Sequence, residues 1–197
     1  MKISPNQFVG KCINEMIKHG ISIHLTQRKN NSKHASNYFD PDKKEFVVNF
    51  FGDYSRKYFL ETFLHEYCHF KQMIDTKFNM TQYDKACEIF NDWLEFKRDS
   101  CPLRVIRLVQ KLELDCEKRA VKLIQKYKLP INIPDYIKQS NVYILSYNIF
   151  HKHRKFFNFS CYYEKDILTL MSSDHVLVKD LGGLPEGFEE IFTKNSE

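Results

Sequence analysis

The segment His65-Glu66-Tyr67-Cys68-His69 places two imidazoles and a carboxylate at a spacing suited to metal chemistry. On an α-helix, positions i and i+4 lie one above the other, so both imidazoles are expected on one face. Two ring nitrogens placed in this way can occupy adjacent corners of a tetrahedral Zn²⁺ site, in which Zn–N distances are about 2.0–2.1 Å. The motif therefore predicts one zinc ion that activates a water molecule, with Glu66 as the general base that accepts the proton of that water.

A catalytic zinc ion needs a third protein ligand and an open fourth position. The downstream candidates are three histidines and three acidic residues, namely His151, His153, His175, Glu113, Asp115 and Glu117. Glu113 lies roughly 65° from the centre of the apolar stripe of its predicted helix, whereas Asp115 and Glu117 lie at about 95–105°. This geometry favours Glu113 as the ligand and leaves Glu117 free to hydrogen-bond a ligand histidine. The alternative interpretation of these acids is a solvent-exposed helix face.

The spacing of apolar residues predicts a mostly helical chain with a small sheet. The predicted helices cover about residues 5–19, 55–75, 81–96, 103–128 and 134–150, and the predicted strands cover 21–26, 45–50 and 175–178. A sheet followed by a helical majority favours an α+β fold, with a mostly antiparallel sheet packed on the helices. We expect one domain over residues 1–197, with the strand at 45–50 on the sheet edge, where an extended peptide substrate could pair with it.

Composition excludes several other classes of protein. The net charge of +5 is spread along the chain and does not form a basic stripe, so we expect no nucleic-acid partner. No apolar run approaches the ~20 residues that a membrane span needs, and the N-terminus lacks the apolar core of a signal peptide. The six cysteines form no CxxC pair and are expected to be reduced thiols. We therefore expect a cytoplasmic protein, in the host cytoplasm if its source is a virus or phage.

The motif HEYCH, followed by Glu113-Leu114-Asp115-Cys116-Glu117 and later Ala120, resembles the gluzincin branch of zinc metallopeptidases. In that branch, which includes thermolysin and the ImmA/IrrE-like peptidases, a glutamate in an ExxxD-type helix motif completes the HExxH site. The resemblance covers roughly residues 45 to 125. It implies a zincin-like fold with His65, His69 and Glu113 as zinc ligands. It also implies Glu66 as general base and Glu117 at the orienting position, where the branch usually has Asp or Asn.

These observations together predict a zinc-dependent metallopeptidase that acts on a protein or peptide substrate. One alternative is a catalytically inactive binding or regulatory protein on the same fold, in which a fourth ligand such as His151 or a cysteine closes the metal site. Another alternative resembles the SprT-like DNA-associated metallopeptidases, in which a third histidine replaces the glutamate. The sequence does not indicate the oligomeric state, and the metal is specified only as divalent.

Two weaker signals lie in the predicted helix at 134–150 and just after it. His151 and His153 could form a second metal site only if they lie on a strand, because on a helix their rings diverge by about 200°. Tyr143, Tyr147 and His151 share one helical face, and one of them could hydrogen-bond the oxyanion of a tetrahedral intermediate. Core packing is the competing interpretation of the tyrosines.

Overall fold

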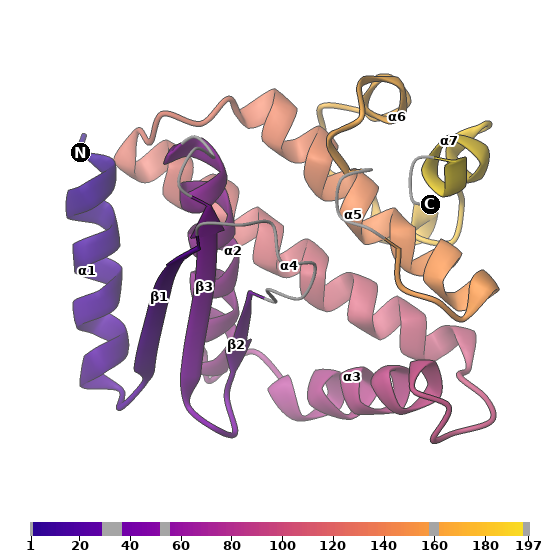
Figure 1. The fold of residues 1–197 in the computed structure, drawn as a ribbon, viewed down its shortest axis with the longest axis horizontal. Helices are drawn as coiled ribbons and strands as arrows, with labels where there is room; N and C mark the ends of the chain where they lie inside the picture. The colour runs from indigo at the N-terminus through magenta and orange to yellow at the C-terminus, as the bar shows by residue number, and fades with distance from the viewer. Residues whose placement is uncertain (1, 29–36, 52–55, 158–161, 195–197) are drawn as a thin grey trace. The chain divides into compact units, whose positions relative to one another are not determined.

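The computed structural model describes residues 2–28, 37–51, 56–157 and 162–194. These residues are mostly helical and contain one three-stranded mixed sheet, which confirms the α+β class (Figure 1). The chain divides into two compact units, one formed by residues 1–78 with 119–131 and the other by 79–118 with 132–197. The expectation of one domain and that of a zincin-like fold both stay predictions.

The first unit begins with α1 (Pro5–Lys18), whose start the sequence predicts well. The Gln7 amide donates to Ser4 Oγ at 3.2 Å, and the Ser4 amide donates to Gln7 Oε1 at 2.9 Å. This reciprocal pair is a capping box, which satisfies two N–H groups that the helix itself cannot bond. After the helix, Gly20 adopts a φ of +75°, a left-handed conformation that a residue with a Cβ rarely takes.

The sheet of the first unit consists of β1 (Ser22–Arg28), β2 (Tyr38–Asp40) and β3 (Glu45–Phe51), in the order β1-β3-β2. β1 runs parallel to β3 along seven residues, whereas β2 pairs antiparallel with β3 along three. The expectation of a mostly antiparallel sheet is therefore wrong. The expectation that residues 45–50 form the edge strand is also wrong, because β3 lies in the centre. Apolar alternation reveals which face of a strand is buried, but it does not reveal the neighbours of that strand.

The helix that carries HExxH is α2 (Arg56–Met73), which packs against β2 and β3. The Phe63 ring lies 5.1 Å from that of Phe46, a fully buried residue of β3. On another side, Tyr67 Oη donates to Glu15 of α1 at 2.5 Å, and Lys71 Nζ lies 2.6 Å from the same carboxylate. Tyr67 and Lys71 each follow a histidine of the motif by two residues, which is about 200° around the helix. The first unit therefore anchors α2 by the side opposite to the histidines.

The second unit contains α3 (Met80–Leu94), the first part of α4 (Leu103–Tyr127), α5 (Ile133–His153), α6 (Lys165–Thr169), the 3₁₀ helix η2 (Val178–Asp180) and α7 (Phe188–Lys194). The middle of α5 is buried on nearly every side, as expected for the central helix of a unit. The five long helices lie where the sequence predicts them, within about two residues at most ends.

The predicted strand at 175–178 is wrong, because a side chain takes the backbone groups that a neighbouring strand would need. Asn141 of α5 donates to the carbonyl oxygens of Ser172 at 3.1 Å and Asp174 at 2.8 Å. The Val176 amide in turn donates to Asn141 Oδ1 at 3.0 Å. These three hydrogen bonds hold the segment in an irregular conformation against α5.

A second polar cluster fixes the turn that follows η2. Arg107 Nη1 donates to Gln110 Oε1 at 2.5 Å, to Asn148 Oδ1 at 2.8 Å and to the Leu181 carbonyl oxygen at 3.0 Å. A Cβ added at Gly182 would lie 2.5 Å from Arg107 Nη2. We expect Gly182→Ala to lower the free energy of unfolding by about 1–3 kcal/mol, because the guanidinium must move away from its acceptors. Urea denaturation of the purified protein measures this change.

The matched control for this prediction is Gly10→Ala. Gly10 lies inside α1, and an added Cβ there would meet nothing within 4 Å. Alanine is favoured over glycine in helices by about 0.5–1 kcal/mol, so this variant should be more stable than the wild type. Equal stability changes in the two variants would contradict the role given to the Arg107 cluster.

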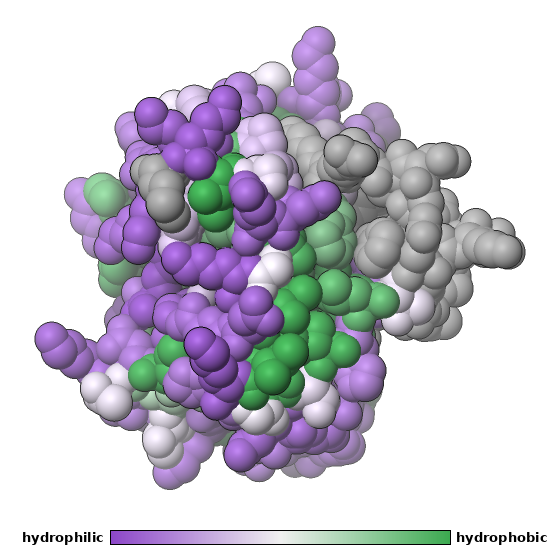
Figure 2. Space-filling view, turned by 90° about the vertical axis from the view of Figure 1, so that its left-hand side faces the viewer, coloured by the Kyte–Doolittle hydropathy of each residue, from purple (hydrophilic) through white to green (hydrophobic). Residues whose placement is uncertain are grey.

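Within the described ranges, no helix combines the length and the apolar character that crossing a bilayer requires. Figure 2 shows the side that carries α1 in Figure 1, where hydrophilic residues cover most of the surface and hydrophobic ones form several smaller areas. Apolar residues exposed in this way are common on folded proteins.

Candidate metal centre

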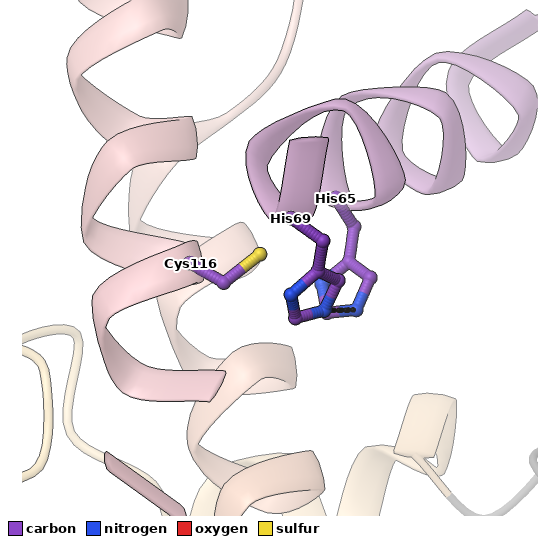
Figure 3. A group of neighbouring side chains, drawn as sticks. All are labelled: His65, His69 and Cys116. Atoms are coloured by element: carbon purple, nitrogen blue, oxygen red, sulfur yellow. Dashed lines mark hydrogen bonds between the residues drawn. The ribbon is translucent and has the colours of Figure 1, made fainter. Parts of the chain in front are cut away.

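The two histidines of the motif point to the same place from one face of α2 (Figure 3). His65 Nε2 and His69 Nε2 lie 3.1 Å apart, and the two rings are nearly perpendicular, at 88°. Two nitrogens bound to one tetrahedral zinc ion at about 2.0–2.1 Å would lie about 3.3 Å apart. The predicted placement of the two histidines is confirmed, and it is close to what one shared cation requires.

Glu66 is buried next to this pair, with 7% of its surface exposed. A carboxylate in such a position is costly unless hydrogen bonds or a positive charge compensate for the lost water. The apolar residues around it on α2, such as Phe63, Leu64 and Phe70, are fully buried. Glu66 is therefore a buried acidic residue on a helix face with fully buried apolar neighbours.

A cysteine completes a group of possible ligands that sequence reasoning missed. His65, His69 and Cys116 each offer one ligand atom, and these atoms all lie within 4.8 Å of one another (Figure 3). Cys116 belongs to α4. Imidazole and thiolate are both ordinary zinc ligands, so the three residues fit a zinc ion. Cys116 also fits the apolar stripe of its predicted helix, and a buried cysteine can serve either in core packing or as a metal ligand.

Glu113, the favoured third ligand, is not part of that group, and its assignment stays a prediction. It is buried, with 6% of its surface exposed, and Glu117 is equally buried. The interpretation of these two acids as a solvent-exposed helix face is therefore wrong. Asp115, the remaining acid, is half-buried.

Two tyrosines of α5 hold the Glu113 carboxylate. Tyr147 Oη donates to Glu113 Oε1 at 3.2 Å, and Tyr143 Oη lies 2.9 Å from Tyr147 Oη. Burial raises the pKa of both tyrosines well above the usual value, and the Glu113 carboxylate raises it further. Both hydroxyls therefore keep their protons, so Tyr143 donates to Tyr147 and Tyr147 donates to Glu113. The hydroxyl of Tyr147 is thus already engaged in a hydrogen bond to Glu113, which counts against the oxyanion role considered for it.

The three downstream histidines differ in their surroundings. His151 Nε2 lies 2.8 Å from the Cys101 carbonyl oxygen, and His153 Nε2 lies 2.9 Å from Glu189 Oε1. Both residues lie on α5, so their rings diverge and form no second metal site. His175 has two buried ring nitrogens without a hydrogen-bond partner among the described residues. Burial lowers the pKa of His175, although the nearby Glu117 works in the opposite direction. Of the three, His175 remains the candidate for a third histidine.

Comparison with models of protein families, with curated proteins and with solved structures finds no match to this chain. The likeness to gluzincins therefore remains a resemblance in its motifs. Any conclusion about function has to be argued from the residues described above.

Proposed function

We propose that this protein is a zinc-dependent metallopeptidase that hydrolyses peptide bonds. The observation that carries the proposal is the pair of Nε2 atoms of His65 and His69, 3.1 Å apart on one face of α2, with the buried Glu66 next to them. The spacing of the motif alone brings the two rings together, and what supports a catalytic role is that they lie close enough to share one cation while the carboxylate between them in the motif is buried.

The proposed roles follow from the chemistry of each side chain. His65, His69 and Glu113 hold the ion, and Tyr147 fixes one oxygen of Glu113 so that the other can face the ion. A bound zinc ion would polarise the scissile carbonyl group and lower the pKa of its water. Glu66 accepts a proton from that water while the water oxygen attacks the carbonyl carbon. Glu66 then passes the proton to the leaving amine when the C–N bond breaks.

The substrate in this proposal is a protein or peptide, and the place of action is the cytoplasm. The cysteines Cys12, Cys68, Cys87, Cys101 and Cys116 are all free thiols. Burial raises the pKa of Cys12 and of Cys87 to about 12, so these two stay protonated and unreactive at neutral pH. Free, buried cysteines are typical of a reducing compartment.

A second candidate function is a regulatory or binding protein with a closed zinc site. The observation that favours it is the inclusion of Cys116 in the group with both histidines. If Cys116 and Glu113 both bound the ion, four protein ligands would fill a tetrahedral site and leave no position for water. Such a site would stabilise the fold and would not hydrolyse peptides.

Metal removal and return test the peptidase proposal. We expect the purified protein to contain one zinc ion per chain and to cleave fluorogenic peptides from a mixed library. A chelator should abolish the cleavage, and an equimolar amount of zinc should restore it, because the water loses its activation without the ion. Elemental analysis and peptide turnover are the two measurements. Zinc-loaded protein that cleaves no peptide would contradict the proposal and favour the closed site.

A further inference from the structure

Gln72 is a fully buried polar residue of α2 that lies one turn after the second histidine of the motif. Its exposed fraction is 0%, and its Oε1 atom lies 2.9 Å from His69 Nδ1. Burial of a primary amide is costly unless its hydrogen bonds are made, so this contact is part of the reason that glutamine is tolerated there. The residue extends the motif to His65-Glu66-x-x-His69-x-x-Gln72.

The contact determines which nitrogen of His69 carries the proton. An amide oxygen can only accept a hydrogen bond, so His69 Nδ1 must donate to Gln72 Oε1. In the neutral ring Nε2 then carries the lone pair, and this atom lies 3.1 Å from His65 Nε2. A metal ion binds an imidazole through such a lone pair, and a hydrogen bond to the other ring nitrogen sets the tautomer and the ring orientation.

We infer that Gln72 is a positioning residue of the metal centre, which holds His69 in the tautomer and orientation that bind the ion through Nε2. The inference rests on the proposed metal site and adds a residue to it. It differs from the roles given to Glu113 and Glu117, because the acceptor comes from the same helix as the ligand. Residues i and i+3 are neighbours on a helix, so α2 supplies both a ligand and its support.

The test compares Gln72→Met and Gln72→Glu with the wild type in the full chain. Methionine has nearly the same length and volume as glutamine but offers no strong acceptor, whereas glutamate accepts again. In zinc-free protein at a pH where His69 is neutral, ¹⁵N NMR should show His69 protonated at Nδ1 in the wild type and in Gln72→Glu. In Gln72→Met we expect a mixture of tautomers and a zinc dissociation constant about 10–100-fold higher, measured by competition with a chelating dye. Gln72→Glu should bind zinc within about threefold of the wild type.

Gln110→Met is the matched control, because Gln110 is also 0% exposed but donates to the carbonyl oxygens of Ile144 and Leu181. It should lower the melting temperature at least as much as Gln72→Met does, because Gln110 also accepts from Arg107, and it should not change the His69 tautomer or zinc affinity. An unchanged tautomer and unchanged zinc affinity in Gln72→Met would overturn the inference. So would an equal loss of zinc binding in Gln72→Glu. A wild-type chain that binds no zinc would refute the proposed function, while the tautomer comparison would still decide whether Gln72 acts on His69.

Discussion

Glu66→Gln is expected to lower peptide turnover by about 10²–10⁴-fold and to leave one zinc ion bound per chain. The amide keeps the size and the buried position of the carboxylate, whose exposed fraction is 7%, so α2 and the two histidines should stay in place. An amide nitrogen cannot accept the proton of the attacking water, so the step that needs a base slows down. Initial rates on a fluorogenic peptide and zinc content by elemental analysis measure the two effects.

Glu15→Gln is the control for this prediction, because Glu15 contacts α2 from the side of Tyr67 and Lys71. Burial opposes the charge of Glu15, but the bonds from Lys71 and Tyr67 outweigh it and hold the pKa below its usual value. At a pH above the usual carboxyl range, Glu15→Gln should therefore have a lower free energy of unfolding than the wild type. This difference should disappear as the pH falls through the pKa of folded Glu15. Its turnover should equal that of the wild type. Loss of zinc from Glu66→Gln, or full turnover without Glu66, would refute the role of Glu66 as a base.

The histidine pair and the helix that carries it could be predicted because the signals are local. The i, i+4 spacing of His65 and His69 fixes their common face whenever the segment is helical, and apolar periodicity makes it helical. The capping box at Ser4 and Gln7 is equally local, since all of its atoms lie within four consecutive residues. Predictions of this kind depend only on helix geometry.

The sheet and the ligands from other elements could not be predicted in the same way. Whether β1 or β2 lies beside β3 depends on backbone pairing between segments far apart in the chain, and alternation of side chains does not encode it. Cys116 satisfies the rule for an apolar stripe and the rule for a metal ligand at once, so spacing alone cannot separate the two. The sequence places Tyr147 on one helical face with Tyr143 and His151, but its partner Glu113 lies on another helix, 34 residues away.

The third ligand can be identified by the zinc affinities of Glu113→Gln, Tyr147→Phe and Cys116→Ser. Loss of a hydrogen bond that supports a ligand weakens zinc binding by about 10–100-fold. We expect a larger loss in Glu113→Gln, because this variant removes a charged ligand. Tyr147→Phe removes only the donor to Glu113 Oε1 and should fall within that range. Cys116→Ser should bind zinc within about threefold of the wild type and keep its turnover, since in the proposed site the thiol does not bind the ion.

Cobalt substitution is an independent way to decide between Glu113 and Cys116 as the third ligand. A thiolate bound to Co²⁺ produces a charge-transfer band that nitrogen and oxygen ligands do not produce. The proposed site of His65, His69 and Glu113 predicts that this band is absent from cobalt-loaded wild type. A band that disappears in Cys116→Ser would instead identify the cysteine as a ligand of the group with both histidines. With Glu113 also bound, such a site has no position for water, so the same result predicts a protein without peptidase activity. An active peptidase should therefore show no cobalt–thiolate band. A band in an active enzyme would require Cys116 to replace Glu113 as the third ligand.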